Sequence, residues 1–119
     1  MPVVAEARGD VDRAARKVFD RAIDVAGGLR KLVEHRNLTW LPSLAEAAYV
    51  VVMKEVGGMT AKAIAAELGI TEATVRNITS SDPEEVRRYL SGELPDLSEH
   101  VAGGLAKLAF GQLREEGKI

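Results

Sequence analysis

The chain contains no cysteine, and only 4% of its 119 residues are aromatic. The lack of cysteine excludes disulfide bonds, thiolate metal ligands and a cysteine nucleophile. Because aromatic side chains are so few, a folded core must be built from aliphatic residues. The chain also lacks any apolar run of about 18 residues or more, so we expect no membrane-spanning helix.

Signals for export and for catalysis are missing as well. The N-terminus, MPVVAEARGD, lacks the pattern of a signal peptide, so we expect a soluble, cytoplasmic protein. His35 and His100 are the only histidines, and neither has a carboxylate or a second histidine at metal-ligand spacing. The sequence has no nucleophile motif and no phosphate-cradling loop. We therefore expect no enzyme activity, no catalytic residue, no metal and no cofactor.

The composition that is present fits one folded domain over residues 1–119. Hydrophobic residues make up 46% of the chain, which argues against disorder. The net charge is −2, whereas a stand-alone DNA-binding domain usually has a basic surface. Residues 1–40 carry eight Lys or Arg against six Asp or Glu, and residues 41–119 carry eight against twelve. The acidic excess therefore lies in the second part of the chain.

Residues 61–80, AKAIAAELGITEATVRNITS, have the spacing of a helix-turn-helix. Ala65 offers a small side chain where two helices cross, and Gly69 tolerates the positive φ of the turn. Thr60 and Thr71 stand where the two helices, expected at 61–68 and 72–80, need their N-caps. The residues expected to face inward are Ile64, Leu68, Ile70, Val75 and Ile78. Two ordinary packed helices are the alternative, but seven positions agree with the motif at once.

The second helix of this motif has an outward face that could read DNA. Arg76 and Asn77 can each form two hydrogen bonds, to guanine and to adenine respectively. Hydroxyl groups of Thr71 and Ser80 can contact phosphate, and Lys62 adds a charge that does not depend on base sequence. The predicted DNA-binding residues are Thr71, Glu72, Ala73, Arg76, Asn77, Ser80 and Lys62.

The periodic segment at residues 10–36 predicts a long N-terminal helix. Its stripe has a period of 3.5 residues, typical of coiled-coil packing, and consists of Val11, Ala15, Val18, Ala22, Val25, Leu29 and Leu32. The stripe keeps its phase across Gly27-Gly28, so we expect a continuous helix rather than a break. Phe19 and Ile23 lie outside the stripe and suggest a second contact face. The charged residues between them predict Asp12–Arg16 and Arg16–Asp20 pairs.

Capping signals divide the rest of the chain. A Ser43–Glu46 capping box predicts a helix that runs to about Glu55, although the valines of 49–53 would also suit a strand. Asp82 and Pro83 open a further short helix. The last helix, 95–117, contains Gly103-Gly104, which suggests either close packing of another helix or a break. We expect a homodimer through the first and last helices, with contacts at Val18, Val25, Leu32, Gly103 and Phe110.

Residues 41–80 resemble the promoter-reading C-terminal domain of bacterial sigma factors and related tetrahelical regulators. The shared pattern is Leu41-Pro42, Val50-Val51, Gly57-x-x-Thr60, Ile64-Ala65, Leu68-Gly69-Ile70-Thr71 and Thr74-Val75. The layout is also similar, more weakly, to archaeal helix-turn-helix regulatory proteins associated with KaiC-like ATPases. The resemblance implies a recognition helix that opens at Thr71, with Arg76 and Asn77 among its reading positions.

These observations together predict an all-α fold of about six helices. A tetrahelical helix-turn-helix core, 41–92, is flanked by long N- and C-terminal helices, and no hairpin signal predicts a wing. The predicted function is a transcriptional regulator that binds duplex DNA as a homodimer. The alternative is a protein-interaction adaptor on the same fold, with an ATPase or the transcription machinery as partner. The acidic run 82–85 beside the motif favours this alternative, because carboxylates oppose contact with phosphates.

Overall fold

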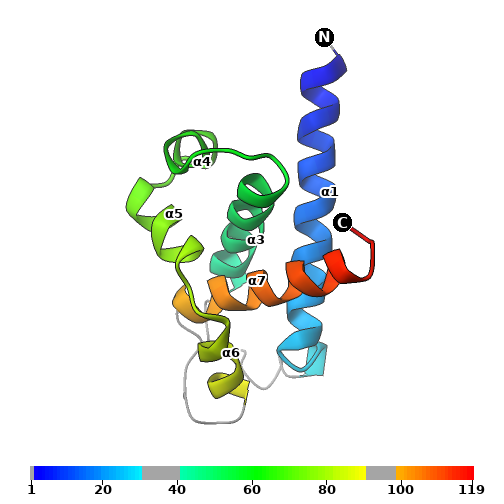
Figure 1. Ribbon diagram of the computed structural model, residues 1–119, viewed down its shortest axis with the longest axis vertical. Helices are drawn as coiled ribbons and strands as arrows, with labels where there is room; N and C mark the ends of the chain where they lie inside the picture. The colour runs from blue at the N-terminus through cyan, green and yellow to red at the C-terminus, as the bar shows by residue number, and fades with distance from the viewer. Residues whose placement is uncertain (1, 31–40, 91–98) are drawn as a thin grey trace.

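The computed structural model describes residues 2–30, 41–90 and 99–119, in which every regular element is an α-helix (Figure 1). The six helices of these ranges are α1 (Pro2–Val25), α3 (Leu41–Glu55), α4 (Ala61–Leu68), α5 (Glu72–Thr79), α6 (Pro83–Leu90) and α7 (Glu99–Glu115). The predicted all-α class is confirmed, and no wing follows α5 in the described chain. None of the described helices is long and apolar enough to span a membrane.

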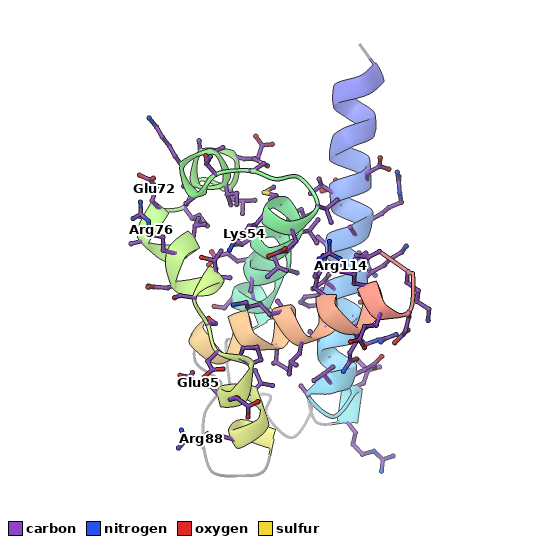
Figure 2. The ribbon with its side chains drawn as sticks, in the orientation of Figure 1. Lys54, Glu72, Arg76, Glu85, Arg88 and Arg114 are labelled. Carbon is purple, nitrogen blue, oxygen red and sulfur yellow. The ribbon has the colours of Figure 1, made fainter. Side chains whose placement is uncertain are left out.

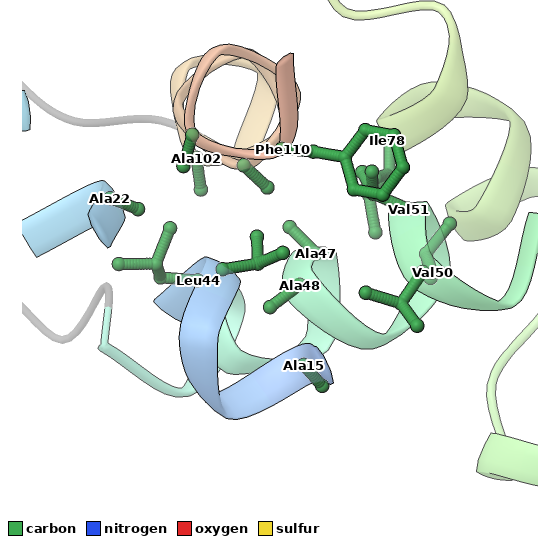
Figure 3. Close-up of a cluster of buried hydrophobic side chains, with 14 of the residues drawn as sticks. Ala15, Ala22, Leu44, Ala47, Ala48, Val50, Val51, Ile78, Ala102 and Phe110 are labelled. Carbon is green, nitrogen blue, oxygen red and sulfur yellow. The ribbon is translucent and has the colours of Figure 1, made fainter. Parts of the chain in front are cut away.

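Helix α7 lies at the centre of the molecule. It packs on α1, α3, α5 and α6, whereas α4 contacts α3 and α5 (Figure 1). The core between these helices consists mainly of alanine, valine and leucine, as the low aromatic content predicted (Figure 3). Phe110 is the one buried aromatic side chain among the described residues. The short side chains allow α1, α3 and α7 to approach closely.

The expectation of a continuous helix through Gly27-Gly28 is wrong. Helix α1 starts at Pro2 and ends at Val25, and both glycines have positive φ, 115° and 87°. The Gly28 amide donates to the Ile23 carbonyl and the Gly27 amide to the Asp24 carbonyl, which is a Schellman ending. These local bonds end the helix although the apolar stripe continues. Leu29 is 74% exposed, and the predicted contact Leu32 lies outside the described residues.

Most of the residues predicted to form dimer contacts lie instead in the core of the single chain. Val18 is completely buried, Phe110 is 5% exposed, and Gly103 is buried as well. Val25 is partly buried against the same core. Both sides of α7 are covered by helices of its own chain, so the apolar residues of α1 and α7 serve this core. The assignment of Val18, Gly103 and Phe110 to a dimer interface is therefore corrected.

The helix bounds agree with the capping signals except at the start of α3. That helix begins at Leu41, so Ser43 lies inside its first turn and is not the N-cap that the capping box predicted. It ends at Glu55 as predicted, and its helical course through 49–53 excludes the strand alternative. The Asp82 side chain accepts a hydrogen bond from the Glu84 amide at 2.9 Å, which caps α6. Helix α7 passes through Gly103-Gly104 without a break. The predicted start of the last helix at residue 95 lies outside the described residues.

Charged side chains clasp α1 to the end of α7. Arg21 donates two hydrogen bonds to the Glu116 carboxylate, at 2.5 and 2.9 Å, and a third to Gln112 at 3.2 Å. On α1 itself, the predicted Arg16–Asp20 pair forms at 3.5 Å. Asp12 does not pair with Arg16 as predicted but accepts a hydrogen bond from the Tyr49 hydroxyl at 2.8 Å. The clasp joins residues that are far apart in the sequence.

This clasp should make stability depend on acid pH. The hydrogen bonds from Arg21, followed by that from Lys118, lower the pKa of Glu116 from 4.5 to about 2. A lowered pKa stabilises the fold fully above about pH 4.5, and this contribution is lost as the pH falls towards 2. We expect Glu116→Gln to be less stable than the parent at pH 6, with the difference disappearing near pH 2. Urea unfolding across this range measures it, and Glu115→Gln, which is exposed at the neighbouring position, serves as the control.

Candidate nucleic-acid interface

The two helices of the motif are set by local signals. The Thr60 hydroxyl accepts a hydrogen bond from the Ala63 amide at 3.1 Å and opens α4. Gly69 has φ 70° and ψ 33°, and its amide donates to the Ala65 carbonyl at 2.9 Å. The Thr71 hydroxyl accepts from the Thr74 amide at 3.0 Å and opens α5. The predicted caps and the predicted glycine turn are thus confirmed.

The inward face of the motif is also as predicted. Ile64, Val75 and Ile78 are at most 1% exposed, and Ala65 is 7% exposed where the two helices cross. Leu68 and Ile70 are only partly buried, at the edge of the core. Helices α4 and α5 therefore pack on α3 through a common apolar face. Their opposite faces remain exposed.

Helix α7 holds the C-terminal end of α5 in place. The Lys107 ammonium donates to the Thr79 carbonyl at 2.7 Å and to the Ser81 carbonyl at 2.9 Å. A cation at this end also interacts favourably with the helix dipole. The buried Ser81 hydroxyl donates to the Asn77 carbonyl at 2.9 Å. Sequence reasoning missed Lys107, although it is the only charged residue within 102–111.

Glycine makes this close contact possible. A Cβ atom on Gly103 would lie 2.4 Å from the Ser81 hydroxyl and 3.0 Å from the Ile78 carbonyl oxygen. On Gly104 it would lie 2.6 Å from a methyl group of Val86 and 3.0 Å from the Asp82 carbonyl oxygen. The predicted close packing at this glycine pair is confirmed. Its partner is the junction between α5 and α6.

The predicted DNA-binding residues are all exposed, and six of them lie on or beside α5. They are Thr71, Glu72, Ala73, Arg76, Asn77 and Ser80, while Lys62 lies on α4. Figure 2 shows Glu72 and Arg76 on the side of α5 that faces away from α3 and α7. The outward face of α5 is therefore open to a macromolecular partner.

Arg76 already has a partner on its own helix. Its guanidinium donates to the Glu72 carboxylate one turn earlier, at 3.4 Å, and the two side chains are 66% and 45% exposed. Exposed pairs of this kind contribute little to stability, so Arg76 can exchange Glu72 for a stronger acceptor at low cost. The Thr71 and Ser80 hydroxyls also have intrachain acceptors, Thr74 and Asn77.

The surroundings of α5 are acidic overall. Residues 54–85 contain three basic residues, Lys54, Lys62 and Arg76, against six acidic ones, Glu55, Glu67, Glu72, Asp82, Glu84 and Glu85. The sum is −3. A positive potential that would hold any DNA sequence is therefore weak here. Within the described residues, no group of three acidic or histidine side chains is placed to bind a metal.

Residues 45–79 match the family model described as sigma-70, region 4. The matched segment begins inside α3 and ends with α5, so it includes the whole helix pair. The match confirms the predicted resemblance for this segment and indicates a DNA-binding helix-turn-helix module. Nothing found supports the weaker similarity to KaiC-associated proteins. A comparison with curated proteins found no match, and a comparison with solved structures found none either.

Proposed function

We propose that this protein, which contains a sigma-70 region 4 type of helix-turn-helix, is a transcriptional regulator that reads duplex DNA with α5 and acts as a homodimer. The observation that carries the proposal is the exposed face of α5, which presents Arg76 and Asn77 next to each other on a helix fixed at both ends. Side chains held on such a rigid helix can enter the major groove with little loss of conformational freedom.

Specific contacts would come from two side chains on this helix. Arg76 can donate two hydrogen bonds to guanine, and Asn77 can pair with adenine. To reach a base, Arg76 must leave Glu72, but that contact is long and exposed. Glu72 then lies close to the DNA and can accept a hydrogen bond from cytosine. Lys62, at the start of α4, adds a contact to the phosphate backbone.

A dimer is proposed because the module carries more acidic than basic residues. One copy offers few basic residues for phosphate contacts, so its non-specific affinity is weak and its salt dependence shallow. Two copies that place their recognition helices one DNA turn apart, about 34–36 Å, combine two weak sites into one specific site. The partner surface cannot be the one formed by Val18, Gly103 and Phe110, because these residues lie in the core.

A protein-interaction adaptor is the second candidate, and the same acidic balance favours it. The excess of carboxylates along 54–85 suits a basic protein surface better than a phosphate backbone. In this case α5 would bind an ATPase or a component of the transcription machinery. The two candidates differ in whether α5 contacts nucleic acid, and one substitution separates them.

Replacing Arg76 by alanine should weaken specific DNA binding by about 1–3 kcal/mol and relax the preference at one base pair. The expected cause is the loss of a bidentate contact to guanine. Lys62→Ala should weaken binding to all sequences alike and make the salt dependence shallower. Selection of bound fragments from genomic DNA, followed by salt titration of the selected sites, measures both effects.

Arg114→Ala provides the matched control. Arg114 is an exposed arginine on α7 (Figure 2). Its guanidinium lies over the ring of Phe110, 5.4 Å from the ring centroid. The Arg114→Ala substitution should leave DNA affinity unchanged because Arg114 is far from α5. If Arg76→Ala and Arg114→Ala bind DNA equally well at low salt, reading by α5 is refuted and the adaptor function takes its place.

A further inference from the structure

A groove of about 440 Å³ lies between α1 and α3, away from the recognition helix. Its α1 wall includes Asp12, Arg16, Phe19 and Asp20, and its α3 wall includes Ala48 and Tyr49. The groove is deep where short alanine side chains line it, and its rim carries both acidic and basic groups. Neither the DNA-reading face nor the clasp between α1 and α7 uses this groove.

The α1 side of the groove is a second face of that helix. The core stripe of α1 includes Ala15, Val18 and Ala22, which are at most 2% exposed. Gly9, Asp12, Arg16, Phe19 and Ile23 repeat at spacings of three and four, about a third of a turn away from that stripe. Phe19 is only partly buried against the core. This spacing suits packing against another helix.

Helix α1 also extends far beyond the groove. Its 24 residues span about 36 Å, and the N-terminal part stands clear of the other described helices along the long axis of the molecule (Figure 1). The helix that forms one wall of the groove therefore continues beyond it as a stretch that has no neighbour in the described chain. A long helical partner has room to lie along α1.

The charges indicate which helix fits. Between residues 9 and 25, α1 carries four acidic residues, Asp10, Asp12, Asp20 and Asp24, and four basic ones, Arg13, Arg16, Lys17 and Arg21. This balance does not favour a partner with charges of one sign. A second α1 that runs antiparallel places Asp12 opposite Arg16 of the partner subunit, and by symmetry Arg16 opposite the partner's Asp12. In the same register, Phe19 lies over the partner's Gly9 and beside the guanidinium of the partner's Arg13.

We propose that the groove between α1 and α3 is the homodimer interface, occupied by the α1 of a second copy in this antiparallel register. The inference rests on the homodimer of the proposed function and assigns a surface to it. Each subunit places its α1 in the groove of the other, which gives a bundle of two α1 and two α3 helices. The interface is then isologous, as expected for a two-fold dimer.

Charge reversal tests both the surface and the register. Asp12→Arg puts two arginines opposite each other at both symmetry-related positions, and Arg16→Asp does the same with two aspartates. Each variant should weaken dimerisation by about tenfold or more, because like charges across an interface repel. An equimolar mixture of the two variants should form a heterodimer, since every Arg then faces an Asp. Sedimentation equilibrium of each variant and of the mixture measures the three dissociation constants.

Two controls separate this effect from damage to the fold. Lys54→Asp reverses an exposed charge on α3 that does not line the groove, and dimerisation should persist. Lys17→Asp reverses an exposed charge on the side of α1 that reaches Lys118, away from the groove, and should leave the dimer intact. Circular dichroism of each variant verifies that the helices are retained.

Any of three results overturns the interface. A parent protein that sediments only as the 12.8 kDa species at concentrations from micromolar to millimolar excludes the dimer itself. A dimer that tolerates both reversals, or single variants that fail to complement each other in the mixture, excludes this groove and register. DNA binding by the parent and its loss in Arg76→Ala are measured separately, so DNA reading can stand when the interface fails.

Discussion

Replacing Gly103 by alanine will destabilise the protein by about 1–3 kcal/mol, although alanine is the better helix former. The added methyl group would lie 2.4 Å from the Ser81 hydroxyl and 3.0 Å from the Ile78 carbonyl oxygen. Ser81 is buried and bonded to Asn77, so its side chain cannot move aside freely. Helix α7 must therefore shift away from the end of α5. Urea unfolding measures the loss of stability.

Gly111 provides the matched control in the same helix. A Cβ atom at Gly111 would meet nothing within 4 Å. Gly111→Ala should therefore show only the gain in helix propensity, about 0.5–1 kcal/mol of added stability. Opposite signs at the two positions are the expected result. If Gly103→Ala is as stabilising as Gly111→Ala, the close contact between α7 and the junction of α5 and α6 does not exist.

Lys107→Met should cost about 1.5–3 kcal/mol of folding stability, the range for hydrogen bonds to a charged group. Methionine keeps most of the apolar stem but leaves the Thr79 and Ser81 carbonyls without their ammonium donor. Both carbonyls lie at the C-terminal end of the recognition helix, so its orientation should loosen as well. DNA affinity should then fall even at temperatures where the protein stays folded.

Lys54→Met is the comparison for that experiment. Lys54 is an exposed lysine at the end of α3, and its replacement removes the same charge. Thermal unfolding should show little change for Lys54→Met and a clear loss for Lys107→Met. If the two variants unfold alike, the contact of Lys107 with α5 contributes nothing. The DNA titration then shows separately whether the net charge alone governs affinity.

The helix-turn-helix could be predicted because its determinants are local. Thr60, Gly69 and Thr71 act on neighbouring amides and carbonyls, so their roles can be recognised from spacing. The bounds of α4 agree with the predicted 61–68, and α5 ends one residue before the predicted 80. The exposure of Arg76 and Asn77 follows from the same helical period.

Two of the three Gly-Gly pairs in the sequence, Gly27-Gly28 and Gly103-Gly104, show where such reasoning fails. Both lie in segments with a regular apolar stripe, but Gly27-Gly28 ends a helix and Gly103-Gly104 lies inside one. The difference at the second pair comes from α5 and α6, which press against it from elsewhere in the chain. The period of the stripe contains no information about such a neighbour. For the same reason, apolar residues on two sides of α7 suggested a dimer when they reflected a central position.

Contacts between distant residues were also beyond prediction. Lys107 reaches carbonyls 26 and 28 residues earlier, and Arg21 binds a carboxylate 95 residues later. Each side chain alone resembles an ordinary surface charge. Only the fold brings the partners together.

The central position of α7 has a consequence for how the protein is made. The recognition helix ends at Thr79, but the side chain that binds its last carbonyls is at position 107. During synthesis, α5 leaves the ribosomal tunnel before the helix that fixes its end has emerged. The reading unit is therefore completed late and by a segment outside 45–79, so a fragment cut to the matched residues should not keep α5 in its native position. Under the proposed function, DNA affinity would therefore be acquired only as the hydrophobic core closes.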